Sequence, residues 1–343
     1  MAKIFKIFEG DEGPTEPILE PDIPIIDTHH HLWPVGSPIA DYPIETFLAG
    51  DVLTGHNIVA TVFAECMAAY HEGGDEALHP VGETEFVVRS CPILPGRPAV
   101  AAAIFGFADL RQPFAGRTLD AHIAAGQGRF SGVRHNVYWH PDQANKLTTG
   151  PRTFPQHLLL DTAFRAGLRE VEKRGLSYDC YLYSDQLPDL IETADAFPDL
   201  TIILCHMGGP VAIDHSPEGR RAVFDRWRVH MAEIGKRPNV WLKAGGIGMD
   251  HYGFPYMDDA RRPTAQKLAD LWRDYFDVAF DAFGPERCMG ESNFPPDKNG
   301  FSYPAYWNAM KLLTRGFSAD ERAALFSETA RRVYKIKYDS SKG

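Results

Sequence analysis

Eight short apolar runs alternate with helical patterns along most of the chain, and this alternation restricts the fold more than any other feature. The runs are residues 22–27, 58–65, 99–108, 131–137, 176–183, 200–206, 239–246 and 286–293. Several are almost continuously apolar, as expected of parallel strands that are buried on both faces. Amphipathic stretches with helical periodicity follow at 159–175, 187–199, 218–238, 264–284 and 318–336.

Eight strands, most of them followed by a helix, predict an α/β fold of the (β/α)8 TIM-barrel type. A length of 343 residues suits one such domain. A doubly wound open sheet is the alternative, but no G-x-G-x-x-G sequence follows the first run. We expect an N-terminal extension at 1–21, a single barrel at 22–336 and a C-terminal tail at 337–343. Loops at 66–82, 138–157 and 247–262 are expected over one end of the barrel.

Composition limits the partners of the chain. The net charge of −11 argues against nucleic acid or an anionic membrane surface as a partner. No apolar run approaches the ~20 residues of a membrane helix, and the first residues lack the apolar core of a signal peptide. Five cysteines without a C-x-x-C pair fit a reducing compartment. We expect a cytoplasmic protein that acts on a small molecule, and the sequence leaves homo-oligomerisation open.

Histidines gather at the ends of two predicted strands. The sequence "DTHHHLW" spans residues 27–33. Because residues i and i+2 of a strand point to the same side, His29 and His31 are predicted to face together, with Asp27 in phase and His30 facing away. His206 ends the run at 200–206 in the same way. Carboxyl ends of barrel strands carry the active sites of this fold, so these histidines are candidate metal ligands or proton carriers.

Charged residues end three other runs. Arg134 and His135 close the fourth run, and only one of this adjacent pair can point inward. An inward arginine would bind a substrate carboxylate through its planar fork, whereas the alternative is a structural salt bridge. Glu65 ends the second run and Lys243 lies in the seventh, and for both a structural and a catalytic role stay open.

The eighth run ends in "GESNFPPDK". Glu291 and Asn293 are predicted to share one face, and Asp297 follows in the loop. A carboxylate acting as general base or as metal ligand is expected in this segment, where Glu291 and Asp297 are the candidates for the base. Asn293 can ligate or hydrogen-bond but cannot accept a proton at neutral pH.

Seven motifs occur in a characteristic order: "DTHHHLW", "FAECMAAY", "VGETEF", "GVRHNVYW", "LCHMGGP", "NVWLKAGGIGM" and "CMGESNFPPDK". With them the chain resembles the amidohydrolase-2 family from about residue 22 to 336, and within it the branch of TIM-barrel metal-dependent hydrolases with an ESNFP motif that includes lactonases. The resemblance implies that the H-x-H histidines, a histidine of strand six and an aspartate after strand eight surround a divalent metal or a substrate carbonyl.

Carried over by residue, His29, His31 and His206 match this pattern, but Asn293 stands where the family has the aspartate. Tyr183 lies in the segment after strand five where relatives often carry a histidine, and no lysine ends strand four to bridge a second metal. Three histidines and a water still make a tetrahedral zinc site. Because an anionic ligand is lost, we expect a divalent metal, with zinc the first choice, to be weakly bound or absent.

The leading hypothesis is a hydrolase that opens a lactone of a small carboxylated molecule. Arg134 would hold the carboxylate, and Glu65, Tyr183 and Asn293 would contact the substrate. The histidines or a metal would polarise the carbonyl, while Glu291, Asp297 or His206 would assist the attack of water.

Two other functions are open on the same scaffold. One is non-oxidative decarboxylation of an aromatic acid. The resemblance implies that a strand-eight carboxylate ligates the metal in relatives with that activity, so Asn293 counts against this alternative. The other is a metal-free binding protein without catalysis. Retention of His29, His31 and His206 together with Arg134 counts against that second alternative.

Overall fold

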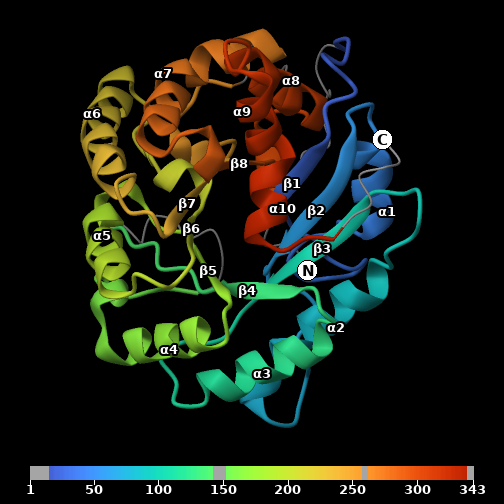
Figure 1. Cartoon of the computed structure of the whole chain (residues 1–343), viewed down its shortest axis with the longest axis vertical. Helices are drawn as coiled ribbons and strands as arrows, with labels where there is room; N and C mark the ends of the chain where they lie inside the picture. The colour runs from blue at the N-terminus through green and yellow to red at the C-terminus, as the bar shows by residue number, and fades with distance from the viewer. Residues whose placement is uncertain (1–14, 142–151, 257–261, 338–343) are drawn as a thin grey trace.

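The computed structural model describes residues 15–141, 152–256 and 262–337. Its centre is a single parallel sheet of eight strands paired in chain order. The strands are β1 (Ile25–His30), β2 (Ile58–Ala64), β3 (Ala99–Gly106), β4 (Phe130–Arg134), β5 (Ser177–Cys180), β6 (Ile202–Leu204), β7 (Val240–Gly245) and β8 (Cys288–Glu291). Each predicted run overlaps one of these strands, and the predicted TIM barrel is confirmed (Figure 1).

The barrel closes between β1 and the chain just after β8. The backbone N–H of Asn293 donates to the carbonyl of His29 at 2.9 Å, and the backbone N–H of His31 donates to the carbonyl of Phe294 at 2.8 Å. The side chain of Thr28 adds a hydrogen bond to the carbonyl of Gly290 at 2.8 Å. Closure therefore brings the histidine-rich segment and the "ESNFP" segment side by side, although they are far apart in the sequence.

Helices surround the outside of the strands (Figure 1). They are α1 (Ile44–Phe47), α2 (Val81–Ser90), α3 (Ala115–Ala125), α4 (Thr162–Lys173), α5 (Leu187–Ala196), α6 (Pro217–Ile234), α7 (Ala265–Phe283), α8 (Tyr303–Leu313), α9 (Ala319–Ala323) and α10 (Thr329–Val333). A π-helical segment, Ala324–Glu328, joins α9 to α10, so the predicted helix at 318–336 contains a wider turn. Ser318 and Glu321 form a capping box at its start.

The C-terminal segment, the chain that follows α10 up to residue 337, packs against the apolar interior of the barrel. Strand residues such as Ile26, Ile203 and Met289 form one buried cluster with Tyr334 and Ile336. In their strands these residues precede the candidate site residues, because Ile26 comes before His29, for example. The segment therefore fills the amino-terminal end of the barrel, and the opposite end is left for the candidate site.

The predicted loops connect strands to helices at the carboxyl ends of the strands. Parts of the loop predictions, residues 142–151 and 257–261, lie outside the described residues, as do residues 1–14 of the predicted extension and 338–343 of the tail. The division into extension, barrel and tail stays a prediction. Within the described ranges, no helix has both the length and the apolar character needed to cross a membrane.

Candidate active site

The first strand carries the histidine pair. β1 extends to His30, three residues beyond its predicted end. The Nε2 atoms of His29 and His31 lie 3.3 Å apart, which confirms that the two side chains face together. The Nδ1 atom of His31 donates to the carbonyl of Ala64 at 2.8 Å, so its Nε2 presents a lone pair. His30 faces away and stacks on Phe47.

Asp27 does not share this face, and its predicted phase is wrong. Its carboxylate accepts hydrogen bonds from Ser292 Oγ at 2.6 Å and from the hydroxyl of Tyr303 in α8 at 3.0 Å. The pairing of β1 with β2 shifts register between Asp27 and His30. Such an irregularity changes which residues face inward, and alternation alone cannot reveal it. Burial raises the pKa of Asp27 to about 6.

His206 and Glu291 form a second pair beside the first. His206 follows β6, and Glu291 is the last residue of β8. One carboxylate oxygen of Glu291 accepts from Nδ1 of His206 at 2.9 Å and from its backbone N–H at 2.7 Å. The other oxygen lies 3.2 Å from Nδ1 of His29. The ring centroids of His29 and His206 are 4.6 Å apart, so three histidines and one carboxylate converge from β1, β6 and β8.

The backbone around this pair is unusual. Gly246, just after β7, has a φ of +66°, and a Cβ there would overlap Nδ1 of His206. A glycine is therefore required for Glu291 and His206 to meet. His206 and Asn293 have φ values of +54° and +53°, which are uncommon for residues other than glycine. Backbone strain of this kind costs about 1–3 kcal/mol per residue and gathers at functional sites.

Burial keeps the histidines neutral. It lowers the pKa of His29 and His31 well below the ordinary range, with further lowering from the charges of Lys243 and Arg134, respectively. Burial also lowers the pKa of His206, although the carboxylate of Glu291 acts against this effect. Neutral imidazoles present lone pairs, so the cluster can bind a cation or accept a proton.

An ion pair lies beneath the histidines. The Nζ atom of Lys243 in β7 donates to Asp179 Oδ2 in β5 at 2.7 Å, and both side chains are inaccessible to solvent. Nζ also lies 3.4 Å from Nδ1 of His29. Burial acts to lower the pKa of the Lys243 ammonium, but the charges of Asp179 and Glu291 and the hydrogen bond to Asp179 together raise it. Asp179 was not among the candidates, although it is the one charged residue in the apolar run at 176–183.

The structure decides which member of the Arg134 and His135 pair points inward. His135 is buried among aromatic side chains on the helix side of the strand, including Phe164 of α4. Arg134 points into the barrel, where its guanidinium carbon lies 5.7 Å from the ring centroid of Tyr181. That ring in turn packs on His206 at 4.7 Å. Arg134 therefore lies one aromatic ring away from the histidine cluster.

Glu65 contacts the same arginine. The backbone carbonyl of Glu65 accepts from Arg134 Nη1 at 3.0 Å, and its side chain lies 3.9 Å from that atom. Arg152 forms a shorter ion pair with Glu65, at 3.1 Å. Arg152 belongs to a predicted loop and carried no signal of periodicity or motif, so sequence reasoning missed it.

Asn293 and Asp297 interact with each other. The side-chain N–H of Asn293 donates to Asp297 Oδ1 at 2.7 Å. The backbone N–H of Gly248, after β7, donates to Asp297 Oδ2 at 2.7 Å. Burial raises the pKa of Asp297 well above its ordinary range. Asp297 thus binds a proton more readily than an exposed carboxyl does.

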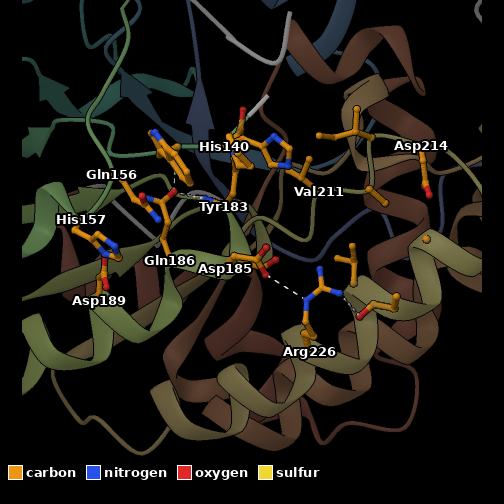
Figure 2. A pocket seen from close by; sticks show the side chains of 18 residues that line it. His140, Gln156, His157, Tyr183, Asp185, Gln186, Asp189, Val211, Asp214 and Arg226 are labelled. Carbon is orange, nitrogen blue, oxygen red and sulfur yellow. Dashed lines mark hydrogen bonds and ion pairs between the residues drawn. The ribbon is translucent and has the colours of Figure 1, made fainter. Parts of the chain in front are cut away.

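Tyr183 lies farther out, between the histidines and a pocket of about 360 Å³. Its ring packs on Tyr138 and Tyr181, at centroid distances of 5.4 and 6.0 Å. Figure 2 shows the pocket, which Tyr183 lines together with Gln186 and the ion pair of Asp185 and Arg226. The pocket offers space for a small polar molecule, and two aromatic rings connect it to His206.

Comparisons with known proteins show the family of this chain. A family model described as amidohydrolase matches residues 26–336. The chain is 32% identical over 333 residues to the uncharacterized protein y4mH of Sinorhizobium fredii, covering 92% of this chain and 99% of that one. It is 27% identical to an L-fucono-1,5-lactonase of Burkholderia multivorans, covering 91% and 96%.

A solved structure shows the same fold. The crystal structure of an amidohydrolase from Burkholderia multivorans with bound zinc superposes with a TM-score of 0.67 at 22% identity, covering 91% of this chain and 99% of that one. The match of the family model spans the barrel from β1 to the C-terminal segment, including every strand that carries a candidate residue. This chain therefore belongs to the amidohydrolase family of enzymes.

Proposed function

We propose that this enzyme hydrolyses a lactone of a small carboxylated molecule at the cluster of His29, His31 and His206. The observation that carries the proposal is the convergence of three neutral imidazoles within the barrel, one ring away from the inward-pointing Arg134. Opening a lactone requires a polarised carbonyl and an activated water, and such a cluster can meet both needs. Similarity to an L-fucono-1,5-lactonase supports the same reaction class.

The donor set fits a divalent metal. Two nitrogens on one tetrahedral zinc with bonds of ~2.0–2.1 Å are about 3.4 Å apart, and Nε2 of His29 and Nε2 of His31 are 3.3 Å apart. Among the described residues, the buried Oε2 atom of Glu291 has no hydrogen bond of good geometry, which leaves it available to an additional group. His29, His31 and His206 would hold the metal, which when bound supplies a Lewis acid for the carbonyl and lowers the pKa of a water.

The chain's own residues would complete the site. Glu291 orients His206 by accepting its Nδ1–H, which leaves a lone pair on Nε2 for the metal or the substrate. Either Glu291 or Asp297 would accept the proton of the attacking water, and burial raises the pKa of Asp297 well above its ordinary range. Arg134 would hold the substrate carboxylate. Tyr183 and Asn293 would contact the remainder of the substrate. The cytoplasmic location of the protein stays a prediction.

The test is a panel of lactones with and without a carboxylate, in which acid release is followed with a pH indicator. We expect turnover of carboxylated lactones, and absence of hydrolysis across the panel would contradict the proposal.

Arg134→Lys keeps the charge but loses the planar fork, so we expect KM to rise about 10-fold with kcat less affected. A fall in kcat at unchanged KM would contradict the anchoring role of Arg134.

Asn293→Asp tests the metal assignment. The variant replaces an N–H···O contact by two buried carboxyl groups, so we expect a lower Tm than wild type in chelator. Zinc that binds the new carboxylate should then raise the Tm of the variant by more than it raises that of wild type, because a ligand that binds only the folded state stabilises it. Equal Tm shifts on adding zinc to the two proteins would show that Asn293 does not lie at a metal-ligand position.

A further inference from the structure

Two arginines and two glutamates form a cluster of ionisable side chains beside the histidines. Arg134 and Arg152, here called the arginine pair, both contact Glu65, Arg134 through the backbone carbonyl and Arg152 through the carboxylate. Glu83 of α2 is completely buried nearby and accepts hydrogen bonds from the backbone N–H groups of Cys66 and Ala68 at 2.9 and 2.8 Å. Arg134, Glu65 and Glu83 are almost inaccessible to solvent, so contacts within the fold hold their side chains in place.

Arg152 is fixed in place by three contacts. Its guanidinium carbon lies 3.6 Å from the ring centroid of Phe107, its Nη2 donates to the hydroxyl of Tyr70 at 2.7 Å, and its Nη1 donates to Glu65 at 3.1 Å. The buried Nε atom of Arg134 has no hydrogen-bond acceptor in the described ranges. The arginine pair therefore has an N–H donor that is available to a planar anion such as a carboxylate.

The balance of charge favours one more anion. Burial, together with the neighbouring charge of Glu65, raises the pKa of Glu83 to about 8, so this carboxyl is mostly protonated at neutral pH. Two guanidinium charges then face the carboxylate of Glu65, while the charge of Asp179, which also acts on Arg134, is already paired with Lys243. An excess positive charge in a buried site is costly unless an anion accompanies it.

The position of the pair suits a substrate that reaches the histidines from outside. Side-chain exposure falls from 22% at Arg152 to 7% at Arg134 and 0% at His29. The ring of Tyr181 contacts both Arg134 and His206. An anion between the two guanidinium groups would therefore place the attached ring near the histidine cluster.

We propose that Arg152 acts with Arg134 to bind one carboxylate of the substrate, and that the carboxylate of Glu65 occupies this anion site when no substrate is bound. The inference rests on the proposed function for the identity of the substrate's reacting end. It assigns specificity for a carboxylated molecule to a pair of residues rather than to Arg134 alone. Glu65 then competes with the substrate for the arginine pair instead of binding the substrate.

Calorimetric titration with glutarate, a dicarboxylate that cannot be hydrolysed, tests the anion site without turnover. We expect wild type to bind glutarate and Arg152→Gln to bind it about 10-fold more weakly, since the variant loses charge-assisted hydrogen bonds to the carboxylate. Arg152→Lys should show a smaller loss, because the charge remains. Arg165→Gln is the matched control, since Arg165 has 24% exposure and a glutamate partner at 2.9 Å.

Glu65→Gln gives the sharper result. If Glu65 competes for the arginine pair, its neutralisation should tighten glutarate binding several-fold, whereas a merely orienting role predicts weaker binding. No glutarate binding by wild type, an unchanged affinity in Arg152→Gln, or weaker binding in Glu65→Gln would each overturn the inference. These results are independent of hydrolysis, so inactivity on every lactone would contradict the proposed function and leave the anion site standing.

Discussion

Replacement of Glu291 by glutamine is expected to lower kcat/KM for a carboxylated lactone by about 100-fold, without unfolding the protein. The carboxylate accepts both Nδ1–H and the backbone N–H of His206, so it fixes the tautomer and direction of that ring. Removing a carboxylate that orients a metal-binding histidine typically costs about 10- to 100-fold. The variant keeps the shape of the side chain, but it loses the charge and replaces one acceptor oxygen with an N–H donor.

The pH profile separates this positioning role from a structural one. Because Glu291 raises the pKa of His206 against the effect of burial, its neutralisation lowers that pKa further. We expect the acidic limb of kcat/KM to move to lower pH in Glu291→Gln. Glu286→Gln, an exposed change five residues earlier, should leave the profile unchanged. A loss of about 10⁴-fold would instead make His206 itself the proton carrier, as in triads whose orienting carboxylate is removed.

Asp179→Asn is expected to lower the free energy of unfolding by about 3–5 kcal/mol. The substitution leaves the ammonium of Lys243 in the interior of the barrel without its partner at 2.7 Å. Breaking a buried ion pair from one side costs this much because the remaining charge is uncompensated. Denaturant unfolding followed by circular dichroism measures the change.

Asp195→Asn is the surface control for this prediction. Asp195 pairs with Arg237 at 2.9 Å but is 55% exposed, so its loss should cost at most ~1 kcal/mol. Adding Lys243→Met to Asp179→Asn should recover much of the lost stability, because the orphan charge is then removed as well. Equal losses in Asp179→Asn and Asp195→Asn would contradict the role assigned to the buried pair.

The sequence by itself determined the barrel, because a parallel strand that is buried on both faces must be apolar almost throughout. Each of the eight apolar runs contains or overlaps a strand, and the helical periodicities of α4 to α7 needed only small adjustments at their ends. Local chemistry also fixed single features, such as the capping box at Ser318, which depends on residues only three apart. The facing of His29 and His31 followed from the period of a strand for the same reason.

Tertiary structure decided everything that depends on register and on contacts between distant segments. The irregularity in β1 turned Asp27 toward α8, and no local pattern marks it. The choice between Arg134 and His135 depended on which side of β4 faces the barrel. The partners Glu291 and Lys243 come from strands more than 80 and 60 residues away from His206 and Asp179, respectively. Alternation along one strand carries no information about such pairs, because closure of the barrel alone brings their strands together.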